Sequence, residues 1–132
     1  MGQEIQPREY ARPEAYSLGW KAGNTVWVAG QTSVDDAGNP AHAGDPLGQA
    51  QTIYRRIGRV LAEAGATPQD IVFIRTYSTD MRFQPMIREE RVKFLGGHRP
   101  ASTSVQVVAL ARPEFLLEIE VVAVIGEGAA RS

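Results

Sequence analysis

Two glutamates near the end of the chain are the first candidates for chemistry. Glu118 and Glu120 lie two residues apart in a strongly apolar segment, and in a β-strand this spacing directs both side chains to one face. A carboxylate in such surroundings must be paired or hydrogen-bonded, or its pKa shifts, so one of the two could serve as a general acid or base. A salt bridge at a subunit contact explains the pair equally well. We expect any small-molecule site to lie mainly within residues 99–120.

Three consecutive hydroxyl side chains, Ser102, Thr103 and Ser104, precede the glutamates on a separate predicted strand. They could line a polar pocket, or they could bond to nearby backbone. No Gly-x-Ser-x-Gly elbow surrounds them, which argues against a serine hydrolase. Ala29 and Gly30 end another predicted strand, where a glycine lets a ligand approach the backbone closely. Turn geometry alone explains this glycine equally well.

The composition limits the classes of function. The chain has 132 residues, which fits one domain, and its formal net charge of −1 supplies no overall basic field for a nucleic-acid backbone. The absence of cysteine excludes thiolate nucleophiles, and two histidines are too few for a histidine-rich metal site, so no metal site is predicted. The polar N-terminus does not look like a signal peptide, and no run approaches the ~18 apolar residues of a membrane span. We therefore expect a cytoplasmic protein without membrane contact.

Periodicity and turn residues predict the element order β-β-α-β-α-β-β. The predicted strands are 16–20, 25–29, 71–79, 101–110 and 115–125, and the predicted helices are 45–64 and about 83–95. Residues 1–15 are expected to form an extended N-terminal arm, residues 16–125 a single domain, and residues 126–132 a polar tail.

The first helix carries the strongest local signal. Asp45 is a good N-cap, Pro46 suits the first helical position, and apolar residues recur at the spacing of one buried face. We expect the opposite face, which includes Arg55, Arg56 and Arg59, to be solvated. Asp80 is expected to cap the second helix in the same manner.

Two helices can cover only one face of such a sheet. The last predicted strand carries apolar residues on both of its faces, and a strand of this kind is covered on both faces. Another subunit is the simplest cover, so the pattern predicts a homo-oligomer. Residues 111–114 are expected to join the last two strands as a hairpin-like turn.

Motifs along the chain resemble the Rid (reactive intermediate deaminase, YjgF) family from about residue 16 to residue 125. In chain order the matching pieces are Ala15-Tyr16-Ser17, residues 23–31, residues 61–65, Thr79-Asp80-Met81, residues 99–105 and residues 117–121. Each piece is weak alone, but the set occurs in order and at the spacing of the family.

The resemblance implies a chorismate-mutase-like α+β fold that assembles into a homotrimer. In such a trimer the sheets form a central barrel, the helices lie outside, and three pockets sit at subunit interfaces. The resemblance also implies hydrolysis of small enamines or imines, such as 2-aminoacrylate, to a keto acid and ammonia without a cofactor. In the family an arginine holds the substrate carboxylate as a bidentate pair, and a glutamate positions or activates the attacking water.

By position, the glutamate corresponds to Glu118, the aromatic pocket wall to Tyr16, and the pocket backbone to Ala29 and Gly30. The arginine position is occupied by Ser102, because the Pro-Ala-Arg of the family reads Pro-Ala-Ser here. Serine cannot form a bidentate ion pair, and losing such a contact typically costs a few kcal/mol. The substitution argues against standard 2-iminopropanoate deamination.

Another arginine could take over the anchoring role. Arg88 aligns with a polar position near the family's pocket and is the better candidate for this role. Arg75 lies among apolar residues and therefore needs a partner. Ordinary salt bridges are the simpler explanation for the presence of both arginines. Arg99 is expected to face away from Ser102, because an odd spacing on a strand reverses the side chain. The predicted ligand-binding residues are Tyr16, Ala29, Gly30, Arg88, Ser102, Thr103 and Ser104, with Glu118 as the catalytic residue.

Three functions remain open at this point. The first is an enamine or imine hydrolase that acts on a small substrate other than the usual one. The second is a non-catalytic trimer that binds a small metabolite or a protein partner. The third, a ribonuclease or translation inhibitor, is the least favoured, because the chain is nearly neutral and lacks a catalytic histidine pair.

Overall fold

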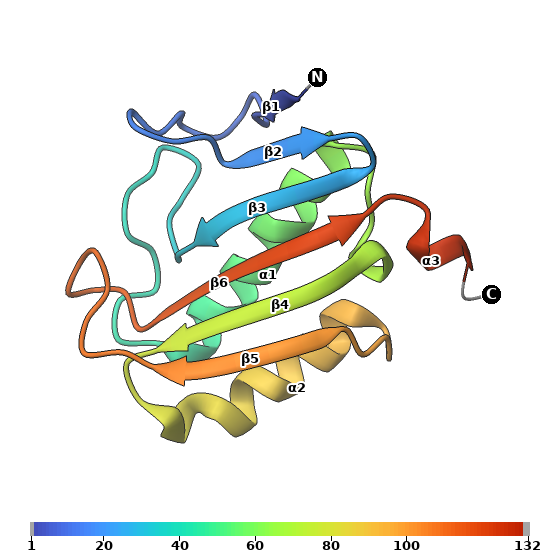
Figure 1. The fold of residues 1–132 in the computed structure, drawn as a ribbon. Coiled ribbons are helices and arrows are strands. Elements are labelled where there is room, and N and C mark those ends of the chain that lie inside the picture. The colour runs from blue at the N-terminus through green and yellow to red at the C-terminus, as the bar shows by residue number, and fades with distance from the viewer. Residues whose placement is uncertain (1, 131–132) are drawn as a thin grey trace.

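Six strands form one sheet in the order β1-β2-β3-β6-β4-β5 (Figure 1). The structure is a computed structural model and describes residues 2–130. Its strands are β1 (Gln3–Ile5), β2 (Gly19–Ala22), β3 (Thr25–Gln31), β4 (Ile71–Ser78), β5 (Ala101–Gln106) and β6 (Leu117–Val124). Its helices are α1 (Pro46–Glu63), α2 (Gln84–Leu95) and the short α3 (Glu127–Ala130), with 3₁₀ turns at Pro68–Asp70 and Met81–Phe83.

The two long helices lie on the same face of the sheet, as predicted, and leave the other face open (Figure 1). α1 begins after Asp45, whose carboxylate accepts a hydrogen bond from the backbone N–H of Gly48 at 3.0 Å. Its apolar stripe, which includes Ile53, Ile57 and Leu61, is fully buried. The core therefore fills the layer between the helices and the sheet. Among residues 2–130, no helix has both the length and the apolar character that crossing a bilayer requires.

β6 lies inside the sheet, antiparallel to β3 on one side and to β4 on the other. The expected hairpin between the last two strands is therefore wrong, because β4 separates β6 from β5, and β5 runs parallel to β4. Burial gives the physical reason. The core-facing residues Leu117 and Ile119 are fully buried, which suits an interior strand. β5 is hydroxyl-rich, largely exposed and ends at Gln106 rather than at Leu110, which suits an edge.

The N-terminal segment contributes more structure than an extended arm. The first predicted strand, 16–20, is displaced, because β2 begins only at Gly19. Within residues 1–15, β1 pairs antiparallel with β2 at the edge of the sheet. Ile5 of β1 is 2% exposed and belongs to the core, so this segment is part of the domain. Met1 lies outside the described residues.

The first part of the predicted tail, residues 126–132, is also tied to the domain. The Asp70 side chain accepts hydrogen bonds from the backbone N–H groups of Gly126 at 3.2 Å and Gly128 at 2.8 Å. These contacts fix the start of α3. Residues 131–132 lie outside the described part of the chain.

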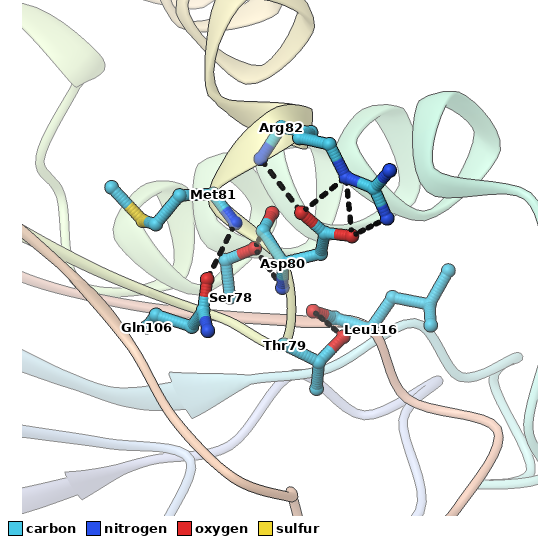
Figure 2. A network of polar contacts seen from close by, with 7 residues as sticks. All are labelled: Ser78, Thr79, Asp80, Met81, Arg82, Gln106 and Leu116. Carbon is cyan, nitrogen blue, oxygen red and sulfur yellow. Dashed lines mark hydrogen bonds and ion pairs between the residues drawn. The ribbon is translucent and has the colours of Figure 1, made fainter.

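A polar network closes the turn between β4 and α2 (Figure 2). Asp80 accepts hydrogen bonds from the backbone N–H and the guanidinium group of Arg82, so it caps the 3₁₀ turn Met81–Phe83 that leads into α2. The prediction that it caps the second helix is wrong, because the N-cap of α2 is Phe83. Gln106, the last residue of β5, accepts a hydrogen bond from the first N–H of the 3₁₀ turn. The N–H of Thr79 donates to the carbonyl oxygen of Leu116 at 3.0 Å. The network thus joins the ends of β4 and β5 to the start of β6.

Gln49 anchors the loop before β6 to helix α1. The side chain is fully buried. Its Nε2 donates to the carbonyl oxygens of His42 at 3.0 Å and Glu114 at 2.9 Å. Its Oε1 accepts a hydrogen bond from the N–H of Leu116 at 2.9 Å. The position of Glu118, two residues further on, therefore depends on a side chain of α1.

Four large apolar side chains cross the open face in one row. The register pairs Trp20 with Trp27, Trp27 with Val122, and Val122 with Phe73, and paired residues share a face. Trp20 and Trp27 are 45% and 46% exposed. An uncovered apolar row of this kind is typical of a surface that another protein chain covers.

Candidate functional site

Glu118 lies on the open face of β6, opposite Tyr77 of β4. Its side chain is half-buried, and within residues 2–130 no hydrogen bond or ion pair engages its carboxyl group. Burial raises the pKa of Glu118, and the negative charge of Glu120 raises it further. A carboxyl group held in this way accepts and returns a proton near neutral pH more readily than an ordinary glutamate.

Glu120 shares this face but is already engaged. Its Oε1 accepts a hydrogen bond from the hydroxyl group of Tyr77 at 2.6 Å and another from Nη1 of Arg75 at 2.9 Å. Arg75 thus has the partner that its position among apolar residues required, and Glu120 balances its charge. Of the two glutamates, Glu118 is the one with an unengaged carboxyl group.

Gly30 of β3 faces the carboxyl group of Glu118 directly. A Cβ atom at position 30 would lie 2.8 Å from Cδ of Glu118 and closer still to Oε2, whereas carbon atoms pack at ~3.5–4.0 Å. The missing side chain therefore creates the space that the carboxyl group occupies. Gly30 also lines a cavity of about 320 Å³, which we call the β3 cavity. Its other walls include Tyr16, Leu18, Gln31 and Arg56.

Arg56 was not expected in this cavity. The prediction of a solvated helix face is wrong for this residue, because only 5% of it is exposed. Its Nε donates to Oε1 of Gln31 at 3.2 Å, and its guanidinium stacks over the ring of Tyr10 at 4.1 Å. The segment that carries Tyr10 folds over α1 and covers this arginine, a contact that helical periodicity could not reveal.

The three predicted hydroxyl side chains do not act together. Because side chains alternate along β5, Ser102 and Ser104 face the helices while Thr103 faces the open side. Oγ of Ser102 accepts a hydrogen bond from Nη1 of Arg91 at 3.1 Å, and Oγ of Ser104 accepts one from Nε2 of Gln84 at 2.8 Å. Both donors belong to α2.

A further cavity, of about 380 Å³, lies between α2 and β5. The predicted ligand residues Arg88 and Ser102 line it, and so do Arg91 and Arg99, which the sequence interpretation did not assign. The argument that turned Arg99 away from Ser102 is wrong, because β5 begins only at Ala101 and Arg99 precedes the strand. The available signal for Arg91 was its spacing of three residues from Arg88 on a helix.

The predicted site residues therefore form two groups. One group gathers at β3 and β6 and contains Tyr16, Gly30 and Glu118. The other lies on the helix side of β5 and contains Arg88, Ser102 and Ser104. Ala29 lines a hollow on the open face beside Trp27. Since β4 and the sheet itself separate the two groups, one small ligand could touch both only if a second copy of the chain supplied one of them.

The sheet is mixed, its interior strand is the last in the chain, and two helices cover one of its faces. A half-buried glutamate lies against a glycine of a neighbouring strand. These features define an α+β protein with the architecture of the YjgF or Rid proteins. The family model described as endoribonuclease L-PSP matches residues 8–125. The chain belongs to this family, which confirms the resemblance that its motifs indicated.

Individual relatives agree with this assignment. The 3-aminoacrylate deaminase RutC of Acinetobacter baylyi is 31% identical over 124 residues, which cover 89% of this chain and 98% of the relative. The structure of RidA from an Antarctic Psychrobacter is 30% identical and covers 93% of this chain and 99% of its own, with a TM-score of 0.85. The structure of E. coli TdcF with bound serine is 26% identical, covers 92% and 98%, and has a TM-score of 0.83. The predicted fold class is confirmed, and the family includes a deaminase.

Proposed function

We propose that the chain hydrolyses a small enamine or imine, with Glu118 positioning and activating the attacking water. The observation that carries this proposal is the state of the Glu118 carboxyl group. It is half-buried, unengaged within the described residues and packed against Gly30, and burial raises its pKa. The name of the relative RutC, a 3-aminoacrylate deaminase, supports the same class of reaction for this chain.

The proposed reaction needs only water and proton transfers. Protonation of an enamine at carbon, together with loss of a proton from its nitrogen, yields an imine. The oxygen of water then bonds to the imine carbon, Glu118 takes a proton from that water, and the C=N electron pair moves to nitrogen, which is protonated. In the resulting carbinolamine the nitrogen takes a further proton from the protonated Glu118, the oxygen loses its remaining proton, the C=O bond forms, and the C–N bond breaks to release ammonia. One carboxyl group that accepts and returns protons can serve both steps, so no cofactor is proposed.

We propose that the complete site forms between the subunits of a homotrimer. The open face carries both the apolar row and Glu118, so a subunit packed on this face would also limit the access of water to the carboxyl group. The separation of Glu118 from Ser102 and Arg88 within one chain supports the same arrangement. In this proposal Arg88, Ser102 and Ser104 contribute from one subunit, and Tyr16, Ala29, Gly30 and Glu118 from its neighbour.

Ser102 limits the choice of substrate. A serine cannot hold a carboxylate as a bidentate ion pair, so we propose a substrate other than 2-iminopropanoate. The same residue favours a second candidate function, in which the trimer binds a small metabolite without converting it.

Release of ammonia and keto acid from a panel of enamines generated in situ tests the proposal. We expect hydrolysis of at least one of them above the uncatalysed rate, and a loss of about 100-fold or more in Glu118→Gln. The matched control Glu63→Gln changes an exposed glutamate of α1 and should leave the rate unchanged. If wild type and Glu118→Gln are equally slow on every member of the panel, the enzyme proposal is overturned. Activity on 2-iminopropanoate that appears only in Ser102→Arg would favour the non-catalytic alternative.

A further inference from the structure

Strand β3 is irregular where it passes the candidate catalytic glutamate. Its register with β6 shifts between Val28 and Gln31, and over this interval Ala29 and Gly30 of β3 stand opposite the single residue Glu120 of β6. Two residues opposite one define a β-bulge. The flanking residues show the same extra residue, because Val28 and Gln31 are each 2% exposed and both face the core, whereas residues three apart on a regular strand point to opposite faces.

The bulge decides which residue lies beside Glu118. In a regular strand Gly30, two residues after Val28, would share its core-facing side. With the extra residue, Gln31 takes the core-facing side instead, and Gly30 lies so close to Glu118 that its missing Cβ leaves the space for the carboxyl group. The half-buried position of Glu118 therefore depends on the bulge.

One amide side chain on the core side of the sheet holds the bulge. Nε2 of Gln31 donates to the carbonyl oxygen of Ala29 at 3.0 Å, and Oε1 of Gln31 accepts a hydrogen bond from Nε of Arg56 at 3.2 Å. A guanidinium group only donates hydrogen bonds, so Arg56 fixes which end of the Gln31 amide faces the bulge. These contacts link helix α1, through a single amide group, to a residue within the bulge.

Arg56 is itself held in place by neutral groups. Its Nη1 donates to the carbonyl oxygen of Asp35 at 3.5 Å, and its guanidinium lies 4.1 Å from the centre of the Tyr10 ring. Among residues 2–130 no carboxylate lies within ion-pair distance of it. A buried cation contributes little to stability, and apolar side chains of similar volume often replace buried ion pairs without loss. What an apolar replacement of Arg56 would lack is the N–H donor to Gln31.

We propose that Arg56 and Gln31 are positioning residues for Glu118: together they hold the β-bulge of β3 from the core side of the sheet, and the bulge in turn holds the carboxyl group in its half-buried place. Neither residue is hydrogen-bonded to Glu118, so they act on it through the backbone of β3. The consequence for deamination rests on the function proposed above, whereas the placement of Glu118 does not. Both residues also line the β3 cavity, so direct contact with a ligand is the alternative that the experiment must separate.

The pKa of the Glu118 carboxyl group, measured by ¹³C NMR on the full chain with labelled glutamate, tests the inference without any turnover. Glu118→Gln identifies the signal, because this variant lacks it. In Arg56→Met the pKa of Glu118 should fall towards that of an ordinary glutamate, because a loosened bulge admits water to the carboxyl group. Removal of a positive charge would by itself raise this pKa, so the direction distinguishes lost positioning from lost charge. Gln31→Met should have the same effect.

The charged groups around Glu118 do not account for such a fall. Glu120 is the charged group that raises the pKa of Glu118, and Tyr77 and Arg75 of β4 hydrogen-bond to Glu120. The strand on the other side, β3, carries no titratable residue. None of these groups is hydrogen-bonded to the proposed positioning residues, so they stay in place in the variants.

Kinetics on an enamine of the panel separate positioning from ligand contact. Arg56→Met should lower kcat about tenfold or more and leave KM within about twofold of wild type. The double variant should be no slower than Gln31→Met alone, because Arg56 acts through that side chain. The control Arg55→Gln removes an exposed positive charge from the same turn of α1 and should leave both the pKa of Glu118 and kcat unchanged. Thermal unfolding verifies that each variant is folded.

Three results would overturn the inference: an unchanged or raised pKa of Glu118 in Arg56→Met, a raised KM at unchanged kcat, which would make Arg56 a ligand contact, or a further loss of kcat in the double variant. If the wild type hydrolyses no member of the panel, the proposed function fails. The NMR titration still decides whether Arg56 and Gln31 position Glu118. The two proposals can therefore fail separately.

Discussion

Replacing Gly30 by alanine should inactivate the protein without unfolding it. Gly30 is not among the residues with positive φ, so its backbone accepts alanine. The new methyl group would lie 2.8 Å from Cδ of Glu118, against a normal separation of about 3.5 Å. The carboxyl group must therefore move by roughly 0.7 Å, and by more at Oε2, which lies closer.

The displacement sets the size of the effect. Misplacing a reacting group by about 1 Å can lower the rate about 100-fold, which corresponds to ~2.7 kcal/mol of transition-state stabilisation. Stability should change little, since alanine removes ~0.4–1 kcal/mol of unfolded-state entropy and offsets part of the crowding. Measurement of kcat/KM for ammonia release, together with thermal unfolding, separates the two effects.

Two comparisons make the test specific to Glu118. Gly58→Ala is the matched control, because its Cβ would meet only Phe94, at 3.4 Å, and it should retain full activity. In a Glu118→Gln background, Gly30→Ala should cause no further loss, since the group that it displaces no longer acts. Full activity in Gly30→Ala would refute the reasoning, as would an equal loss in both backgrounds.

Three further predictions concern stability and assembly. Because burial raises the pKa of Glu118, the folded state binds this proton more tightly than the unfolded state, so wild type should lose stability as pH rises from about 4 through the folded-state pKa. Glu118→Gln should therefore melt at a higher temperature than wild type at neutral pH and at the same temperature below pH ~4. A lower melting temperature of the variant at neutral pH would contradict this. Gln49→Ala breaks three hydrogen bonds in the core and should lower the free energy of unfolding by roughly 3 kcal/mol in denaturant titration, while Gln51→Ala on the exposed side of the same helix should have little effect. Light scattering should give the wild type a mass of about three times the 14.4 kDa of one chain, and Trp27→Glu should reduce it to that of the monomer; a monomeric wild type would refute the trimer.

The helices and the main strands follow from signals that lie close together in the sequence. The cap at Asp45, the apolar stripe of α1 and the cap at Asp80 each depend on a few neighbouring residues. Local interactions of this kind act wherever the segment lies in the fold. The bounds of α1 and α2 accordingly agree with the prediction to within a residue or two.

The order of the strands could not be predicted in the same way. It depends on pairing between distant segments, and adjacency in the sequence favoured a hairpin between the last two strands. The apolar character of both faces of β6 was interpreted as a subunit contact. It contains no information on which strands pair with the edges of β6, and these are β3 and β4.

For the candidate site, the sequence predicted the face on which a side chain lies, but not the residues of other strands that contact it. The face shared by Glu118 and Glu120 follows from their spacing, but the partner of each does not. Residues of β4 hydrogen-bond to Glu120, whereas the carboxyl group of Glu118 occupies the space beside Gly30 on β3. The burial of Arg56 depends on where the N-terminal segment folds, for which the sequence contains no local signal.

The interior position of β6 has a consequence for how the chain reaches this fold. β6 follows the other five strands in the chain, yet it alone joins β3 to β4. Before it arrives, β1-β2-β3 and β4-β5 are separate fragments, and the inner edges of β3 and β4 expose unpaired N–H and C=O groups. Folding therefore waits for a late, long-range event and should be slow for a chain of this length. During that interval the two unpaired strand edges are the surfaces through which newly synthesised chains can associate and aggregate.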